Sequence, residues 1–279
     1  MDEYFYRKHL RKPAKFLLSI ICFMEIIVFL FGALTCINVV DDISIGIITL
    51  TLLLIAFGLI LSIELLLIYF ILYRRFKYIS ISLADEGIVY KNSKGIQNIS
   101  YDEIEKIKFP SIRYLGGWMK IIKGNKTIRL TVTLENLGDF INKLKDKLSE
   151  RNMNNVYDER KLFNFQKTAV YADHSWARIY ESFNIRSLIF IVLCILTLVL
   201  GCISNIGFSY IPVTLIIVLY PLISYIISEI IIGIKFSKKV KAYGKVILER
   251  DIELEKKANI IGYISAAIIS IILIGIIII

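Results

Sequence analysis

Residues 45–73 read IGIITLTLLLIAFGLILSIELLLIYFILY, with Glu64 as their one charged residue, whereas residues 81–109 read ISLADEGIVYKNSKGIQNISYDEIEKIKF and alternate apolar with polar positions. An apolar run of about 20 residues, rising ~1.5 Å per residue, crosses the ~30 Å hydrocarbon core of a bilayer as a helix. Alternation with a period of two is typical of half-buried strands. Together the two stretches predict a membrane span that leads directly into a small soluble β-rich domain.

Further apolar runs of similar length occur elsewhere in the chain. The 279 residues are 56% hydrophobic, with a mean hydropathy of +0.66. The first run is too long for the core of a signal peptide and lacks a small-residue cleavage site, so we expect it to remain as an anchor. The sequence predicts five spans, at residues 16–37, 45–73, 185–206, 211–234 and 258–279.

The basic residues predict the orientation of these spans. The connections 38–44 and 204–212 contain no Lys or Arg, so all 34 basic residues fall on the same side of the membrane. By the positive-inside rule that side is the cytoplasm, with the N-terminus inside and the C-terminus outside the cell (plasma) membrane. We attribute the net charge of +10 to this topology and to an anionic phospholipid surface, and we expect no nucleic-acid partner.

The soluble insert shows strand periodicity that later changes to helix periodicity. Gly124 and Asn125 form a hairpin signal between two of the strands. Six or seven short strands should precede one amphipathic helix that covers the apolar face of the sheet. The expected strands are 79–83, 88–92, 96–100, 105–109, 118–122 and 127–134, and the helix stripe is Leu137, Phe140, Ile141, Leu144 and Leu148.

The order of strand, DEGI.Y turn, strand, ISYDEIEKI, Gly-bounded hairpin and C-terminal helix resembles the bacterial pleckstrin-homology (PH)-like domain family over about residues 76–150. The resemblance implies a small β-barrel or sandwich closed by a C-terminal helix, inserted into a five-span α-helical membrane domain. The chain would then be an α+β integral membrane protein. Eukaryotic PH domains that hold phosphoinositides use a basic loop between their first two strands. The loop here is the acidic ADEG, so inositol-lipid binding is not carried over.

These expectations divide the chain into consecutive parts. They are a basic cytoplasmic N-terminus (1–15), a transmembrane hairpin of spans 1 and 2 (16–75), the cytoplasmic PH-like domain (76–150), a cytoplasmic amphipathic helix (151–184), a hairpin of spans 3 and 4 (185–234), a basic cytoplasmic helical segment (235–257) and span 5 (258–279).

The segment 157–183 carries a heptad-like apolar seam and predicts a helix leading into the third span. This helix would pack on the soluble domain or on neighbouring helices, form a dimerising coil, or lie at the membrane interface anchored by Trp176 and Tyr180. We interpret His9 and His174 as polar-face residues, because no acidic or Cys cluster accompanies either of them.

Three acidic residues, Glu25, Glu64 and Glu229, lie inside the predicted spans. We count Arg186 as a boundary residue at the start of the third span and place no Lys or Arg inside a span to pair with these acids. Buried carboxyls at this depth should be protonated, hydrogen-bonded or turned to a wet cavity, which makes them a candidate polar site. Glu25 and Glu64 lie at similar depth on neighbouring spans and could share a proton. The candidate contacts for lipid headgroups follow the fourth span, at Lys235, Lys238, Lys239, Lys241 and Lys245.

The resemblance implies a membrane-tethered interaction or sensory scaffold, with roles in envelope stress or in protection against membrane-active peptides, whose partner is a protein or a second copy of the chain. The alternative is a small transporter or channel component that uses the membrane-embedded glutamates. We expect no enzyme, no catalytic residue, no metal and no cofactor. The chain has two histidines and shows no Ser/His/Asp set, metal-ligand cluster, P-loop or GxGxxG motif.

Overall fold

The computed structural model of the protein describes residues 2–39, 43–112, 116–204 and 210–278. The two predicted outer connections, 38–44 and 204–212, lie partly outside these residues. The chain divides into two compact units, which we describe separately. The sheet unit comprises Met1–Pro13, Ile68–Arg178 and Phe236–Arg250, and the helix unit comprises Ala14–Leu67, Ile179–Lys235 and Asp251–Ile279.

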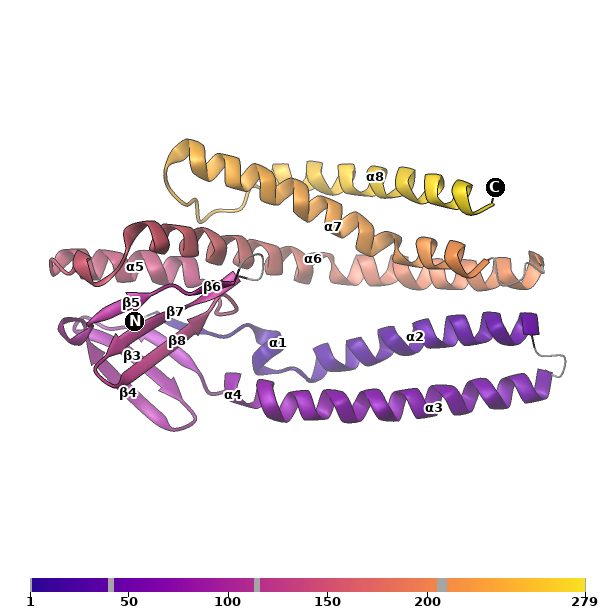
Figure 1. The fold of residues 1–279 in the computed structure, drawn as a ribbon, viewed down its shortest axis with the longest axis horizontal. Coiled ribbons are helices and arrows are strands. Elements are labelled where there is room, and N and C mark those ends of the chain that lie inside the picture. The colour runs from indigo at the N-terminus through magenta and orange to yellow at the C-terminus, as the bar shows by residue number, and fades with distance from the viewer. Residues whose placement is uncertain (1, 40–42, 113–115, 205–209, 279) are drawn as a thin grey trace. The chain divides into compact units, whose positions relative to one another are not determined.

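Five helices in the described residues are long and apolar enough to cross a membrane, with mean hydropathies between 2.3 and 2.7 over their most apolar stretches. This confirms the predicted number of apolar helices and indicates a membrane protein. They are α2 (Ala14–Val39), α3 (Ile43–Ile68), α6 (Glu159–Ser204), α7 (Tyr210–Tyr243) and α8 (Ile252–Ile278), as Figure 1 shows.

Within the helix unit, α2 and α3 form an antiparallel hairpin (Figure 1) in which glycines admit side chains from the opposite helix. Gly32 leaves room for Leu50, and Gly58 leaves room for the carboxylate of Glu25. A second contact joins α2, α6 and α7 through a cluster of buried side chains. That cluster contains Leu30, Leu34, Phe190, Cys194 and Val218.

The sheet unit contains two antiparallel sheets in the described part of the chain. The first has the order β1-β2-β3-β4, with β1 Glu3–Phe5, β2 Ser80–Leu83, β3 Gly87–Asn92 and β4 Gly95–Ser100. In the second, β7 (Gly116–Lys123) pairs with β5 (Lys106–Lys108), β6 (Ser111–Ile112) and β8 (Lys126–Thr131). The helix α5 (Leu137–Glu150) follows β8 along the chain.

The predicted strands and turns of this unit are confirmed with small shifts at their ends. Gly124 and Asn125 form the hairpin between β7 and β8, and Gly124 has the positive φ of 51° that favours glycine. The alternation breaks after β4 because Ser100 and Glu103 form a capping box around the 3₁₀ turn Tyr101–Glu103. The last strand ends at Thr131, three residues before the predicted end.

The N-terminal arm, residues 2–13, is part of the sheet unit. Its strand β1 pairs with β2, with Glu3 opposite Ser82, and the short helix α1 (Lys8–Arg11) follows. Tyr4 and Tyr6 are buried in the core of the unit. Local periodicity does not predict β1, because the strand has only three residues and its partner strand lies more than seventy positions away in the sequence.

The core of the sheet unit lies between the sheets, α5 and the first part of α6. The predicted stripe of α5 is buried throughout, which confirms an amphipathic helix that packs its apolar side on this core. Leu162, Phe165 and Ala169 of α6 join the same core. Of the alternatives for 157–183, packing on the soluble domain therefore describes the first half of this segment.

One expectation for the segments next to the core was wrong. His174 is buried and its Nε2 lies 2.8 Å from the carbonyl oxygen of Leu248, so it is not a polar-face residue. The basic segment 235–257 contains a bend: α7 ends at Tyr243, Gly244 follows with φ 64°, and α8 starts at Ile252. The remaining short elements are a π-helical turn (Tyr69–Tyr73), α4 (Arg74–Phe76) and a 3₁₀ turn (Asn154–Val156).

Candidate functional site

The structure gives the three predicted membrane acids different surroundings. Glu25 is half-buried and its Oε1 faces the space beside Gly58, whereas the side chain of Glu64 is exposed. Among the described residues, no hydrogen bond or ion pair joins the carboxyls of Glu25 and Glu64. Glu229 is half-buried on α7.

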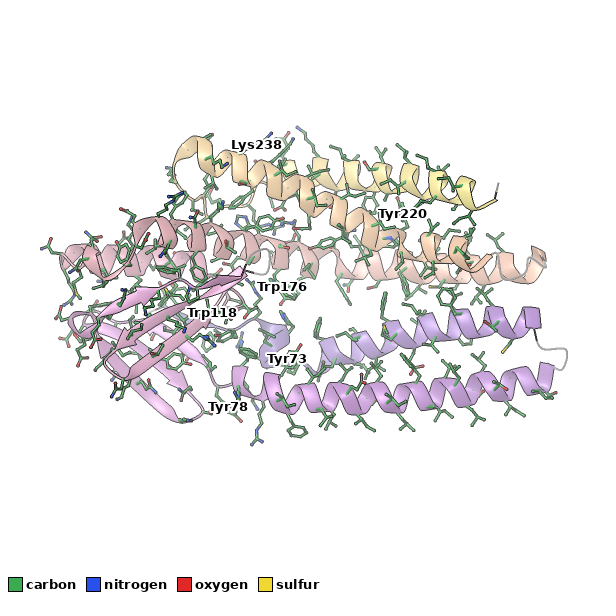
Figure 2. The ribbon with its side chains drawn as sticks, viewed as in Figure 1. Tyr73, Tyr78, Trp118, Trp176, Tyr220 and Lys238 are labelled. Atoms are coloured by element: carbon green, nitrogen blue, oxygen red, sulfur yellow. The ribbon has the colours of Figure 1, made fainter. Side chains whose placement is uncertain are left out.

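The five predicted headgroup lysines lie at the end of α7 and just beyond it. Lys235, Lys238, Lys241 and Lys245 are exposed, and Lys239 is half-buried. Cations in the last turn of a helix interact favourably with the helix dipole, so Lys241 also has a local structural role. Figure 2 labels Lys238 in this segment.

An arginine at the boundary of the predicted third span lies at the centre of a polar group in the helix unit. Arg186, on α6, donates through Nη1 to the carbonyl oxygen of Pro221 and to Oγ of Ser224, both at 3.0 Å. Its Nη2 donates to Oδ1 of Asn259 at 3.3 Å. We call Arg186, Pro221, Ser224, Tyr225, Asn259 and Tyr263 the Arg186 cluster. It joins α6, α7 and α8.

In the described part of the protein, the Arg186 cluster stabilises its guanidinium with neutral partners and without an ion pair to a carboxylate. The guanidinium carbon lies 5.0 Å from the ring centre of Tyr225 and 5.3 Å from that of Tyr263. A delocalised guanidinium is weakly hydrated and suits such cation–π contacts better than an ammonium does. Interhelical hydrogen bonds of this kind stabilise helix association in membranes by about 0.6 kcal/mol each on average. The cluster is thus suited to holding three helices in one arrangement.

The N-terminal arm of the sheet unit contributes a buried arginine, Arg7. Nη2 of Arg7 lies 2.6 Å from Oδ1 of Asp173 on α6, and the two side chains are 4% and 17% exposed. The same nitrogen donates to the carbonyl oxygen of Val132 at 3.3 Å. The guanidinium carbon also lies 5.8 Å from the ring centre of Trp176. We call Arg7, Asp173, Trp176 and His9 the Arg7 site.

His9 completes the Arg7 site and corrects its expected place on a polar face. It is buried, and its ring stacks on Trp176 with the ring centres 4.2 Å apart. Burial, together with the charge of Arg7, lowers the pKa of His9 to about 4. The imidazole is therefore neutral at physiological pH, because desolvation disfavours its charged form.

The two arginine sites were missed for different reasons. Arg186 was counted as a boundary residue, although polar residues recur on α7 one turn apart, at Ser224 and Ser228, in an otherwise apolar helix. That recurrence is the signal that could have located a polar contact. For Arg7, the signal is the aromatic run of Tyr4, Phe5 and Tyr6 directly before it, which is unusual in a tail that stays in solvent.

Comparison with known proteins finds no matching family model, no matching curated protein and no matching solved structure. In the residues that the structure describes, no group of three His, Cys, Asp or Glu side chains is placed to hold a metal ion.

Proposed function

We propose that the protein is a membrane-tethered scaffold of a bacterial cell membrane, in which a PH-like sheet unit binds a protein partner and couples that binding to five spans. In this proposal the N-terminus and the sheet unit lie in the cytoplasm and the C-terminus lies outside, as the distribution of Lys and Arg predicts. A sensory role in envelope stress, or in protection against membrane-active peptides, follows from the resemblance to the PH-like family.

The observation that carries the proposal is the assembly of the sheet unit from three separate stretches of chain. Met1–Pro13, Ile68–Arg178 and Phe236–Arg250 form one compact unit, although apolar helices separate them in sequence. Each of the five apolar helices is therefore joined covalently to this unit at one end. A change of shape in the sheet unit can then act on every span through a short connection.

The arm is held firmly enough to serve in such coupling. β1 pairs with β2 over three residues, and Tyr4, Tyr6 and Leu10 are buried. Burial of a large apolar side chain contributes about 1.5–3 kcal/mol. Release of the arm would also separate the buried Arg7 from its carboxylate. The first span thus starts from an anchored segment rather than from a loose tail.

The PH-like assignment is supported by the two antiparallel sheets around a shared core and by the helix that follows them. α5 buries its whole apolar stripe in that core, as the family's closing helix would. Fold similarity alone does not identify a ligand, so the partner is argued from the surface of the unit.

The alternative, a transporter or channel component, has less support. Such a site would require polar groups that converge on one path, whereas Glu64 is exposed and Glu25 faces Gly58. Proteoliposome flux assays on the wild type and on Glu25→Gln with Glu64→Gln test this alternative. Flux that depends on the two carboxyls would favour transport over the scaffold.

Photo-crosslinking in native membranes tests the scaffold directly. A photoreactive residue replaces Ile96, whose side chain is 65% exposed on β4, and a second chain carries it at Glu150, an exposed residue of α5. The proposal expects a reproducible protein adduct from at least one position. Adducts with phospholipid alone, from both positions, would contradict it.

A further inference from the structure

The outer face of the second sheet carries a row of cations in register. The pairing places Lys108 of β5 opposite Lys120 of β7, and Lys120 opposite Arg129 of β8. Their apolar neighbours Ile107, Ile121 and Ile128 point into the core. Since side chains alternate along a strand, the three cations share the opposite face. Lys106 is exposed on the same face.

This face lacks compensating acids among the residues that the structure describes. None of the four cations of the face forms an ion pair there. The nearest acidic residues along the chain are already engaged at the β7–β8 turn, where Glu103 contacts Lys123 and Glu105 accepts from the backbone N–H of Gly124. Like charges directly opposite each other on a sheet destabilise it, by up to about 1 kcal/mol per pair. An anionic partner would remove that cost.

We infer that this face, which we call the basic face (Lys106, Lys108, Lys120 and Arg129), binds an acidic helix of a protein partner. The inference rests on the proposed scaffold function, since it names the chemistry of the scaffold's partner. Neighbouring strands lie about 4.8 Å apart, so the row of three cations advances in steps of that size. Residues three and four apart on a helix have Cβ atoms about 5–6 Å apart. A helix lying across the strands, with acidic residues at i, i+4 and i+7, therefore matches the row.

The face is less suited to a lipid surface, the other anionic partner that a membrane protein meets. Faces that bind bilayers combine cations with apolar or aromatic side chains that enter the interface. The aromatic residue here is Trp118 of β7, labelled in Figure 2, and the guanidinium carbon of Arg129 lies 4.5 Å from its ring centre. Trp118 is half-buried, its indole Nε1 is buried and its ring faces Arg129, so it offers a bilayer less apolar surface than an exposed anchor would.

The test uses the full chain in nanodiscs of neutral phosphatidylcholine and two synthetic helical peptides of equal composition. One peptide places glutamates at i, i+4 and i+7 on one face, and the other distributes them around the helix. We expect the patterned peptide to bind at least tenfold more tightly than the distributed one. Lys120→Glu with Arg129→Glu should weaken patterned binding at least tenfold. Lys91→Glu with Lys94→Glu, an equal charge change at exposed lysines of β3 and its turn, should weaken it less than threefold.

Three results would overturn the inference. They are equal binding of the two peptides, equal losses from the two double variants, and weaker binding of phosphatidylserine vesicles by the Lys120/Arg129 variant without a loss of peptide binding. If the charge reversals unfold the sheet unit, Lys120→Gln with Arg129→Gln provides the same comparison without introducing acids. A protein adduct from Ile96 would still support the scaffold if the basic face failed this test, so the two proposals fail separately.

Discussion

The guanidinium groups of Arg7 and Arg186 both lie between packed elements, but they contact different partners. In the sheet unit, Arg7 is 4% exposed and forms a 2.6 Å ion pair with Asp173. In the helix unit, Arg186 meets a carbonyl, a hydroxyl, an amide and two phenol rings. The sheet unit thus stabilises its buried cation with an opposite charge, and the helix unit does so with dipoles and aromatic rings. The difference predicts how each site responds to losing its cation.

The largest effect should come from Arg7→Met, because it leaves the carboxylate of Asp173 buried without its partner. Removing one member of a buried pair costs about 3–5 kcal/mol in the free energy of unfolding. Equilibrium denaturation of the full chain in detergent, followed through hydrogen exchange of the β1 and β2 amides, measures this loss. Lys145→Met removes an exposed 2.7 Å pair with Glu159 and should cost below about 1 kcal/mol.

The double variant Arg7→Met with Asp173→Leu sharpens the comparison. Replacing a buried ion pair by apolar residues of similar volume is often close to neutral, so the double variant should recover most of the stability that Arg7→Met loses. A double variant no more stable than Arg7→Met would show that the pair contributes through something other than its charges.

Arg186→Met should lower the free energy of unfolding by less, about 1–3 kcal/mol, because it leaves no buried carboxylate without a partner. The measurement is unfolding of the full chain by titration with sodium dodecyl sulfate. Arg186→Lys keeps the charge but lacks the planar guanidinium that donates hydrogen bonds to Pro221, Ser224 and Asn259. It should therefore restore less than half of the stability that Arg186→Met loses. If Arg186→Met lost as much stability as Arg7→Met, the proposed difference between the two arginine sites would be wrong.

Two glycine substitutions in the helix unit test how closely the helices approach each other. At Gly262, an added Cβ would lie 2.6 Å from the backbone oxygen of Ser224 in the Arg186 cluster, so α7 or α8 must shift, at about 1–2 kcal/mol. At Gly58, the added Cβ would meet Oε1 of Glu25, the end of a flexible side chain, and Gly58→Ala should cost less than Gly262→Ala. The same detergent titration measures both variants, and a larger loss of stability in Gly58→Ala than in Gly262→Ala would contradict this prediction.

The smallest effect should be a pH dependence confined to the Arg7 site. Burial holds the pKa of His9 near 4, below its ordinary 6.5. The released arm therefore binds the proton more tightly than the packed arm does. The stability contributed by the packed arm is complete above pH 6.5 and falls as the pH drops towards 4, by about 1 kcal/mol at pH 5.5. His9→Phe keeps a ring beside Trp176 and should remove this slope, which hydrogen exchange of β1 at pH 7.5 and 5.5 reports. An unchanged slope in His9→Phe would assign the titration to another group.

Which parts of the structure the sequence could predict depends on how far apart in the sequence the contacting residues lie. The apolar helices, the strands from Ser80 to Thr131 and the stripe of α5 depend on local periodicity and are confirmed. The strand β1 and the partners of His9 depend on contacts across 70 or more positions, and period and composition do not encode such contacts. The Arg186 cluster lies between these cases, since its serines recur one turn apart on α7 but its arginine comes from α6.

The measurement that tests the account most directly is a disulfide between residues 3 and 82 in native membranes. The four native cysteines are replaced by Ser, and cysteines are introduced at Glu3 and Ser82, which face each other across β1 and β2. Facing residues of antiparallel strands have Cα atoms about 4.5–5.5 Å apart, within the reach of a disulfide. The control pairs residue 3 with Asn98 of β4, about 14 Å away across three strand spacings. The account predicts rapid crosslinking of 3 with 82 and little of 3 with 98. Equal crosslinking of both pairs, or none at 3 and 82, would contradict the anchored arm on which the scaffold depends.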